Sequence, residues 1–179
     1  DVYKRQGEAG HSMKKIVTCE EMKKLDGATI HHIGVASEVL MERAALKVVE
    51  EIEKYLEKNE RILVVCGSGN NGGDGIAVAR LLYLKGIRAE FCMVGNKDKM
   101  TRETVLQYKI ATGYQVPEVN NPDWSEYTTI VDAVFGVGLV RPIEGHYAEV
   151  IHEMNSARAK KIAVDIPSGV NLSLIHISE

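Results

Sequence analysis

The chain has 179 residues, of which 45% are hydrophobic and 26% charged, enough for one domain with a buried core. Its net charge of −3 gives no basis for a nucleic-acid or anionic membrane partner, and no apolar run approaches the roughly 20 residues that span a bilayer. Three widely spaced cysteines, Cys19, Cys66 and Cys92, predict neither zinc nor a disulfide framework and favour a reducing, cytoplasmic compartment.

Both ends of the chain differ in character from the rest. Residues 1–12 show no hydrophobic periodicity, and the sequence from Met13 onward reads like the natural start of a protein. The strings DVYKRQ and LSLIHISE resemble translated sequencing-adapter read-through. We therefore expect a non-native or disordered leader at 1–12, a C-terminally truncated domain at 13–171, and a non-native tail at 172–179.

Helical and strand patterns alternate along the chain. After an amphipathic opening at 18–32, helices are predicted at 38–58, 76–85, 102–112 and 144–157, and strands at 61–66, 89–94, 129–134 and 161–165. The polar stretch 113–127 is predicted to be a surface loop. Alternation of this kind predicts an α/β fold, a Rossmann-like three-layer sandwich with a mostly parallel sheet, incomplete at its C-terminus. Its last strand is expected to expose an edge.

The first strand is followed by the glycine-rich stretch Gly67–Gly75, which contains GxGxxG and leads into a helix. This pattern is typical of dinucleotide binding, with Glu90 near the place of a ribose-binding acid. Two details disfavour a dehydrogenase. Glu90 falls early in its strand, and Asp74, expected in the first helical turn, would repel a pyrophosphate. The plainer alternative is a glycine turn capped by Asp74.

Two later strands also end in polar loops. Asp132 ends an apolar run, where it either caps backbone amides or ligates a cation, and the sequence leaves both open. Arg141, in the same loop, is either a phosphate contact or a surface ion-pair partner. Asp165 and Ser168 follow the last strand. Because strand ends converge in a parallel sheet, Asn71, Asp132, Asp165 and Ser168 predict a site for an alkali or alkaline-earth cation.

The histidines are weaker candidates for a functional site than the strand-end loops. His31 and His32 are a pair at a helix end, and His146 and His152 lie on a helix that looks exposed. No Ser-His-Asp spacing accompanies them. We interpret all four as solvated side chains.

Three ordered motifs, GSGNNGGDG, DAVFGVGLVRP and AVDIPSGVN, together resemble the NAD(P)H-hydrate epimerase family (YjeF N-terminal domain). The entry segments EEMKKLD and LMERAA resemble that family as well, so the similarity runs over 18–171. Two departures stand out. Ala45 replaces a glycine that is usual in the family, and the family domain continues past the DIPSG loop.

The resemblance implies an isomerase of nicotinamide nucleotide repair. Its substrate would be NADHX or NADPHX, hydrated at ring carbon C6, and its reaction would interconvert the R and S epimers. An ADP- or ATP-dependent dehydratase, fused or separate, would then act on the S form, and a homodimer is compatible with the family. A potassium ion would be held by Asn71, Asp132 and Ser168. Substrate would be bound by Asn70, Asn71, Gly72, Gly73, Asp74, Gly136, Val137, Gly138, Leu139, Val140, Arg141, Pro142 and Asp165.

The chemistry of the hydrated ring points to one catalytic candidate. Its C6 is a hemiaminal carbon, and inversion needs cleavage with a proton donor followed by addition to the opposite face. A positioned carboxyl group suits such acid/base work, and Asp165 is our candidate. Two alternatives remain: a non-catalytic dimerisation or RNA-associated scaffold of the same fold, and a nicotinamide-dependent dehydrogenase.

Overall fold

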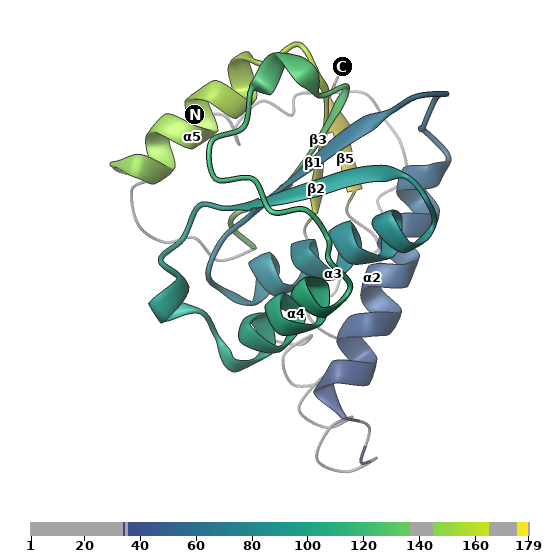
Figure 1. Cartoon of the computed structure of the whole chain (residues 1–179), viewed down its shortest axis with the longest axis vertical. Coiled ribbons are helices and arrows are strands. Elements are labelled where there is room, and N and C mark those ends of the chain that lie inside the picture. Colours follow the sequence, from purple (N-terminus) through teal and green to yellow (C-terminus); the bar gives the residue numbers. More distant parts are fainter. Residues whose placement is uncertain (1–33, 35, 137–144, 165–174, 179) are drawn as a thin grey trace, which may run out of the picture.

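The computed structural model describes residues 34, 36–136, 145–164 and 175–178, and its centre is one five-stranded sheet (Figure 1). The strand order is β2-β1-β3-β4-β5. The first four strands along the chain are mutually parallel, and β5 pairs antiparallel with β4. The strands are β1 (Arg61–Cys66), β2 (Arg88–Met93), β3 (Thr129–Ala133), β4 (Lys160–Val164) and β5 (Ile175–Ser178). The predicted α/β class is confirmed.

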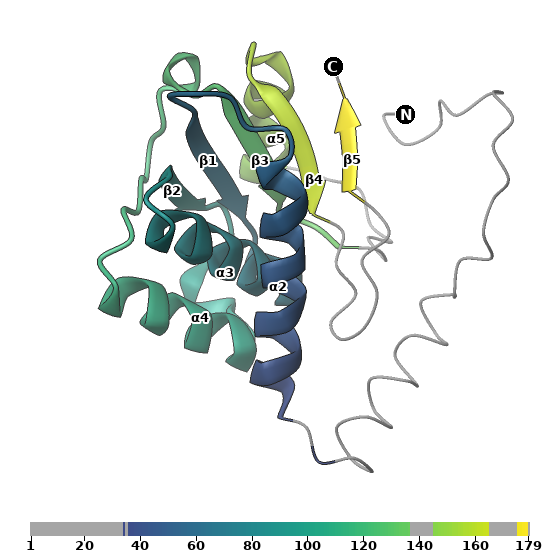
Figure 2. The same cartoon turned by 90° about the vertical axis from the view of Figure 1, so that its right-hand side faces the viewer.

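Helices cover both faces of this sheet. Three of them lie on one face and α5 lies on the other, which gives the three expected layers (Figure 2). None of the helices within the described ranges is long and apolar enough to cross a bilayer. The helices are α2 (Ser37–Glu53), α3 (Asn70–Leu84), α4 (Arg102–Gly113) and α5 (His146–Ser156), with short 3-10 turns at Lys97–Lys99 and Trp124–Glu126.

The strands alternate their side chains between two hydrophobic clusters. In β1, Ile62 and Val64 point to the cluster shared with α2 and α3, whereas Leu63 and Val65 point to the cluster shared with α5. All four side chains are fully buried. A strand that is buried on both faces carries an unbroken apolar run, which explains why this segment was readily predicted.

Two predicted helix boundaries were wrong. The helix expected to start at Ile76 starts at Asn70, inside the glycine-rich stretch. The helix expected to reach Lys58 ends at Glu53, where the N–H groups of Tyr55 and Leu56 bond three residues back, to Ile52 and Glu53. A helix end often tightens into 3-10 bonding in this way.

The predicted surface loop 113–127 pairs with β2 and contributes side chains to the core. Phe91 in β2 donates its N–H to the carbonyl of Pro117 at 3.0 Å and accepts from the N–H of Val119 at 2.9 Å. Further along, Trp124 and Tyr127 pack into the α5 cluster. This segment therefore flanks the outer side of β2 and carries the chain to the other face, which its polar composition did not predict.

The expected free edge at β4 is paired. Residues Ile175–Ser178 lie antiparallel to it, with Ile162 opposite Ile177 and Val164 opposite Ile175. An edge strand presents unpaired N–H and C=O groups, so an extended segment near it finds backbone partners there. The predicted opening helix at 18–32, with His31 and His32, lies outside the described residues.

Candidate active site

The carboxyl ends of β1 and β3 meet directly. The N–H of Gly67 donates to the carbonyl of Ala133 at 3.1 Å, and a Cβ on Gly67 would overlap the carbonyl oxygen of Val134. From β1 the sheet extends to β2 on one side and to β3 and β4 on the other. In open α/β sheets ligands bind at this kind of switch point, beyond the carboxyl ends of the strands.

Glycines bring α3 against this junction. A Cβ on Gly72 would overlap the carbonyl oxygen of Gly67, and one on Gly75 would overlap the Ala133 side chain and lie 3.0 Å from the Cys66 sulfur. Both glycines are helical, so they serve close helix–sheet packing and not a flexible loop. The predicted nine-residue loop is in fact a short turn followed by helix.

Asn71 and Gly136 are brought together, as the sequence predicted for the first and second motifs. An ideal Cβ on Gly136 would lie 3.5 Å from the Asn71 Cβ and 3.8 Å from its Oδ1. Asn71 is only 8% exposed, and neither its Oδ1 nor its Nδ2 has a hydrogen-bond partner among the described residues. Buried amides are normally paired, so this side chain is suited to a ligand.

Asp74 does not cap the helix. It is the fifth residue of α3, beyond the first turn, and only 1% exposed. Neither carboxyl oxygen has a partner in the described part of the chain. Burial raises the pKa of this carboxyl to about 8, so the group is largely protonated at pH 7. The capping interpretation is therefore wrong, and the raised pKa weakens the repulsion of a pyrophosphate that was expected from this side chain.

The raised pKa of Asp74 predicts a pH-dependent stability. The folded-state pKa of about 8 exceeds the ordinary value of 3.8, so folding favours the protonated form and stability falls as pH rises between those values. Each pH unit in this window changes the free energy of unfolding by about 1.4 kcal/mol. We expect the melting temperature of the wild type to decline from pH 5 to 8 by roughly 3–6 °C per unit relative to Asp74→Asn.

Thermal melts of both proteins at four pH values test this expectation. Asp98→Asn, which changes an exposed carboxylate, is the matched control. Parallel melting-temperature curves for the wild type and Asp74→Asn would show that folding does not raise the pKa of Asp74.

Asp132 lies in β3 with its carboxylate half-buried. One oxygen accepts a hydrogen bond from the N–H of Val134 at 3.0 Å, which supports the capping interpretation and fixes the turn that leads to Gly136. Burial raises the pKa of this carboxyl, and the hydrogen bond from the Val134 N–H offsets part of that rise. One backbone bond leaves a carboxylate further lone pairs for a cation.

Glu90 is fully engaged in structure. It is the third residue of β2, where it pairs with Arg61 at 3.3 Å and accepts a hydrogen bond from the Tyr127 hydroxyl at 2.7 Å. It therefore ties the amino-terminal halves of β1 and β2 to Tyr127, which lies just before β3, away from the carboxyl edge. This location argues against a ribose-binding role and hence against the dehydrogenase interpretation.

Several predicted positions lie outside the described residues and stay predictions. They include the catalytic candidate Asp165, the potassium ligand Ser168 and the phosphate contact Arg141, with its loop 137–142. Cys66 and Cys92 are buried free thiols as expected. His146 and His152 are exposed on α5, which agrees with their interpretation as solvated side chains.

Two threonines near the site were missed by the sequence analysis. Thr101 is the N-cap of α4, and its hydroxyl oxygen accepts from the N–H of Thr104. Thr104 is fully buried, and its hydroxyl donates to the carbonyl of Gly69 at 2.9 Å. A threonine directly before a predicted helix signals an N-cap, but nothing in the local sequence distinguishes Thr104.

A family model described as YjeF-related protein N-terminus matches residues 37–178. The chain belongs to this family. It is 47% identical over 157 residues to a protein of Oenococcus oeni named NAD(P)H-hydrate epimerase, covering 87% of this chain and 75% of that protein. It is 48% identical over 159 residues to a protein of the same name from Limosilactobacillus reuteri, covering 88% and 75%.

A solved structure supports the fold of this family member. The crystal structure of yeast ynu0, YNL200c, superposes with a TM-score of 0.73 at 23% sequence identity. The match covers 86% of this chain and 70% of the yeast chain. The expected family and architecture are both confirmed.

Proposed function

We propose that this protein is an isomerase that interconverts the R and S epimers of NADHX and NADPHX in nicotinamide nucleotide repair. The observation that carries this function is the identity of nearly half with relatives named NAD(P)H-hydrate epimerase, over three quarters of their length. The proximity of Asn71 and Gly136 at the switch point of the sheet is a structural observation that agrees with it. Both residues belong to motifs that the family resemblance assigns to substrate binding.

In this proposal the amino end of α3 and the loop from Gly136 to Pro142 hold the hydrated nucleotide. The buried Asn71 amide offers both a donor and an acceptor. The neutral Asp74 carboxyl offers one further donor without repelling the phosphates. Arg141 supplies positive charge to them.

Asp165 is proposed to move the proton. It would first protonate the departing group at the hemiaminal carbon and then, as a carboxylate, accept a proton from the nucleophile that adds on the opposite face. One carboxyl group alternating between its two forms is sufficient for inversion.

The assay that tests the function uses chemically prepared R-NADHX. The epimer ratio is followed by chromatography with and without protein, and the slow unaided epimerisation provides the background. A rate above background that scales with protein concentration is the expected result. A ratio that drifts only at the background rate would favour the scaffold alternative, and reduction or oxidation of nucleotide would favour a dehydrogenase.

A potassium site is the second part of the proposal. The ligands would be Asn71, Asp132 and Ser168. The Asn71 Oδ1, which has no partner in the described part of the chain, and the partly engaged Asp132 carboxylate are hard oxygen donors that fit this ion. A bound cation would supply positive charge near the nucleotide and hold the strand-end loops together.

We expect potassium to raise the melting temperature of the protein more than a bulky organic cation does at equal ionic strength. Asp132→Asn should lose most of this difference, because it removes the only formal charge of the ligand set. Thermal melts in the two salts measure the effect, with Asp98→Asn as the control. Identical shifts for both cations in the wild type would rule the site out.

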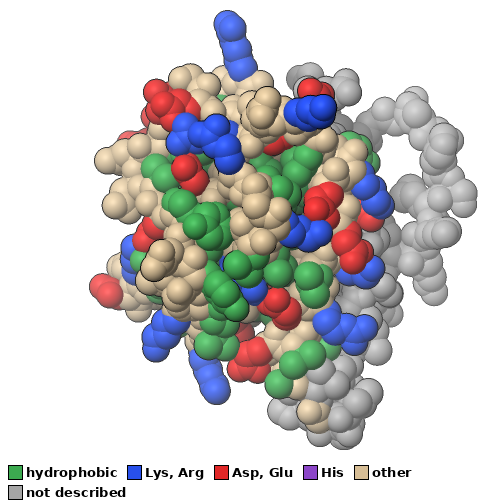
Figure 3. Space-filling model, turned by 45° about the vertical axis from the view of Figure 1, so that its right-hand side comes forward, with side chains coloured by type: hydrophobic (Ala, Val, Ile, Leu, Met, Phe, Trp, Pro, Cys, Tyr) green, Lys and Arg blue, Asp and Glu red, His purple; other side chains and the backbone are tan. Residues whose placement is uncertain are grey.

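The partners and the cellular compartment of the protein are also part of the proposal. Lys and Arg side chains are interspersed with Asp and Glu on the face in Figure 3. The proposed partner is a small-molecule substrate, and neither nucleic acid nor a membrane. Buried free Cys66 and Cys92 are compatible with a cytoplasmic location. A dehydratase that acts on the S epimer, and a homodimer, remain part of the proposal.

A further inference from the structure

The amino end of α4 is fastened to the start of α3. The Thr104 hydroxyl donates to the carbonyl of Gly69, the N-cap residue of α3. That carbonyl also accepts the N–H groups of Gly72 at 3.0 Å and Gly73 at 3.3 Å. Thr104 is thus a third donor on the oxygen atom from which α3 begins, and it reaches this atom from a different helix.

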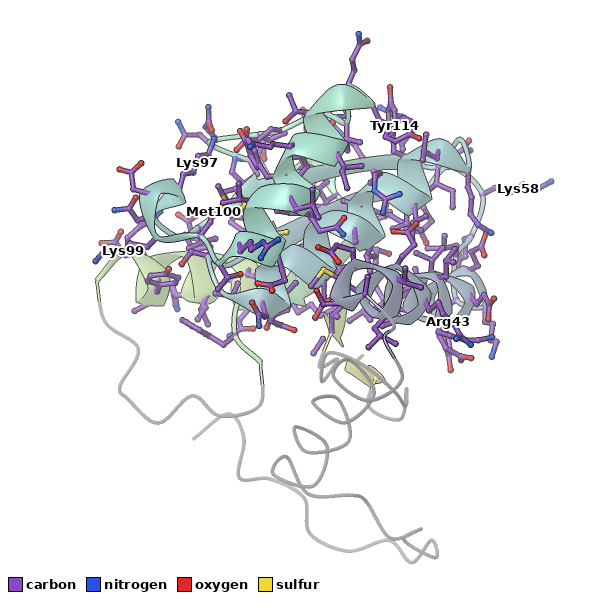
Figure 4. The ribbon with its side chains drawn as sticks, turned by 90° about the horizontal axis from the view of Figure 1, so that it is seen from below. Arg43, Lys58, Lys97, Lys99, Met100 and Tyr114 are labelled. Atoms are coloured by element: carbon purple, nitrogen blue, oxygen red, sulfur yellow. The ribbon has the colours of Figure 1, made fainter. Side chains whose placement is uncertain are left out.

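A second bond and a close approach reinforce this contact. The N–H of Thr101 donates to the carbonyl of Ser68 at 3.1 Å. A Cβ on Gly73 would lie 2.8 Å from the Thr104 hydroxyl oxygen, so α4 approaches α3 where α3 has no side chain. Figure 4 shows α4 running between Met100 and Tyr114 beside α3.

The hydrogens of the two threonine hydroxyls can be assigned. Their oxygens lie 2.8 Å apart, and each hydroxyl carries one hydrogen. Because Thr104 donates its hydrogen to Gly69, Thr101 must be the donor within the pair. The chain of bonds therefore runs in one direction, from Thr101 through Thr104 to Gly69.

We propose that Thr104 is a positioning residue of the epimerase site, which acts by fixing the direction in which α3 leaves Gly69. Asn71 is the second residue of α3, so a rotation about Gly69 displaces its amide from Gly136. The carbonyl of Gly69 keeps two intrahelical donors without Thr104. The hydroxyl therefore sets orientation, and the helix can form without it. This inference rests on the proposed function.

The test compares Thr104→Val, which removes the hydroxyl and keeps the shape, with Thr104→Ser, which keeps the hydroxyl. Thr112→Val is the matched control, because the Thr112 hydroxyl donates to the carbonyl of Tyr108 within α4 itself. For Thr104→Val we expect the KM for R-NADHX to rise roughly three- to tenfold, the factor that corresponds to one net hydrogen bond. Its kcat should stay within about twofold. Thr104→Ser and Thr112→Val should both keep the wild-type KM.

Amide hydrogen exchange at 69–73 gives a readout that does not depend on activity. Exchange should be faster in Thr104→Val than in the wild type, and unchanged in Thr112→Val. If Thr104→Val fails to fold, Thr104→Ala removes the same hydroxyl without adding bulk and carries the same comparison.

The outcomes separate the inference from the proposed function. A folded Thr104→Val protein with the wild-type KM and wild-type exchange overturns the positioning role. A lower melting temperature with unchanged KM, or a raised KM that Ser does not restore, also overturns it, since the residue would then only stabilise or fill space. Epimerisation by the wild type at the background rate overturns the proposed function, while the exchange experiment still decides whether Thr104 orders α3.

Discussion

Asp165→Asn is expected to lower the turnover of NADHX epimerisation by a factor of about 10²–10⁴, the usual contribution of a general acid or base. Asparagine keeps the size of the side chain and most of its hydrogen bonds, but it cannot transfer a proton. Binding of the nucleotide should change far less, because the phosphates and sugars are assigned to Gly72, Gly136 and their neighbours.

Steady-state kinetics with R-NADHX, corrected for unaided epimerisation, measure both quantities. Asp98→Asn, at an exposed carboxylate, should behave as the wild type. If Asp165→Asn retained full turnover, the residue would only bind substrate. Asp74, a buried and largely protonated acid close to Asn71 along α3, would then be the next candidate.

Gly72→Ala is expected to cause the largest loss of stability among single methyl additions at the site. The new Cβ would overlap the carbonyl oxygen of Gly67, which belongs to the backbone and cannot rotate away. To make room, α3 must move off the sheet, and overpacking of this kind costs about 3 kcal/mol. The melting temperature should fall by roughly 6–12 °C, and epimerase activity should be lost with it.

Gly69→Ala is the matched control for this substitution. Apart from its chain neighbours, no atom of the described residues lies within 4 Å of a Cβ built on Gly69, and its φ of −81° suits any residue. We expect a loss below about 1 kcal/mol, from a poorer helix N-cap. Equal melting temperatures for the two alanine variants would mean that α3 sits farther from β1 than this structure has it.

The sequence predicted the fold well because its signals were local. Buried parallel strands carry unbroken apolar runs such as Arg61–Cys66, and helices carry their own periodicity. The start of α3 was missed because glycine and asparagine are poor helix formers, so Asn70–Gly75 looked like a loop. Tertiary packing overrides this propensity, because only a helix without side chains on one face can lie this close to the junction of β1 and β3.

The candidate site was predicted only in outline for a similar reason. The rule that strand ends converge predicted that the loops after β1 and β3 lie side by side, and Asn71 and Gly136 are neighbours in the structure. That the pKa of Asp74 is raised could not follow from the sequence, because the burial that raises it depends on the fold. The role of Glu90 in joining Arg61 and Tyr127, and the bond from Thr104 to Gly69, depend on contacts between residues far apart in the chain.

The bond from Thr104 to Gly69 can form early while the chain is being synthesised on the ribosome. It joins residues 35 positions apart, whereas the backbone bond from Arg61 to the Thr128 side chain, where β1 and β3 begin to run together, joins residues 67 apart. Chains emerge at about 5–20 residues per second, and N-terminal parts fold first. Thr104 precedes Thr129, the first residue of β3, by 25 residues, so the start of α3 can be set before β3 emerges. The nascent half then presents a finished strand end on which β3 and Gly136 can dock.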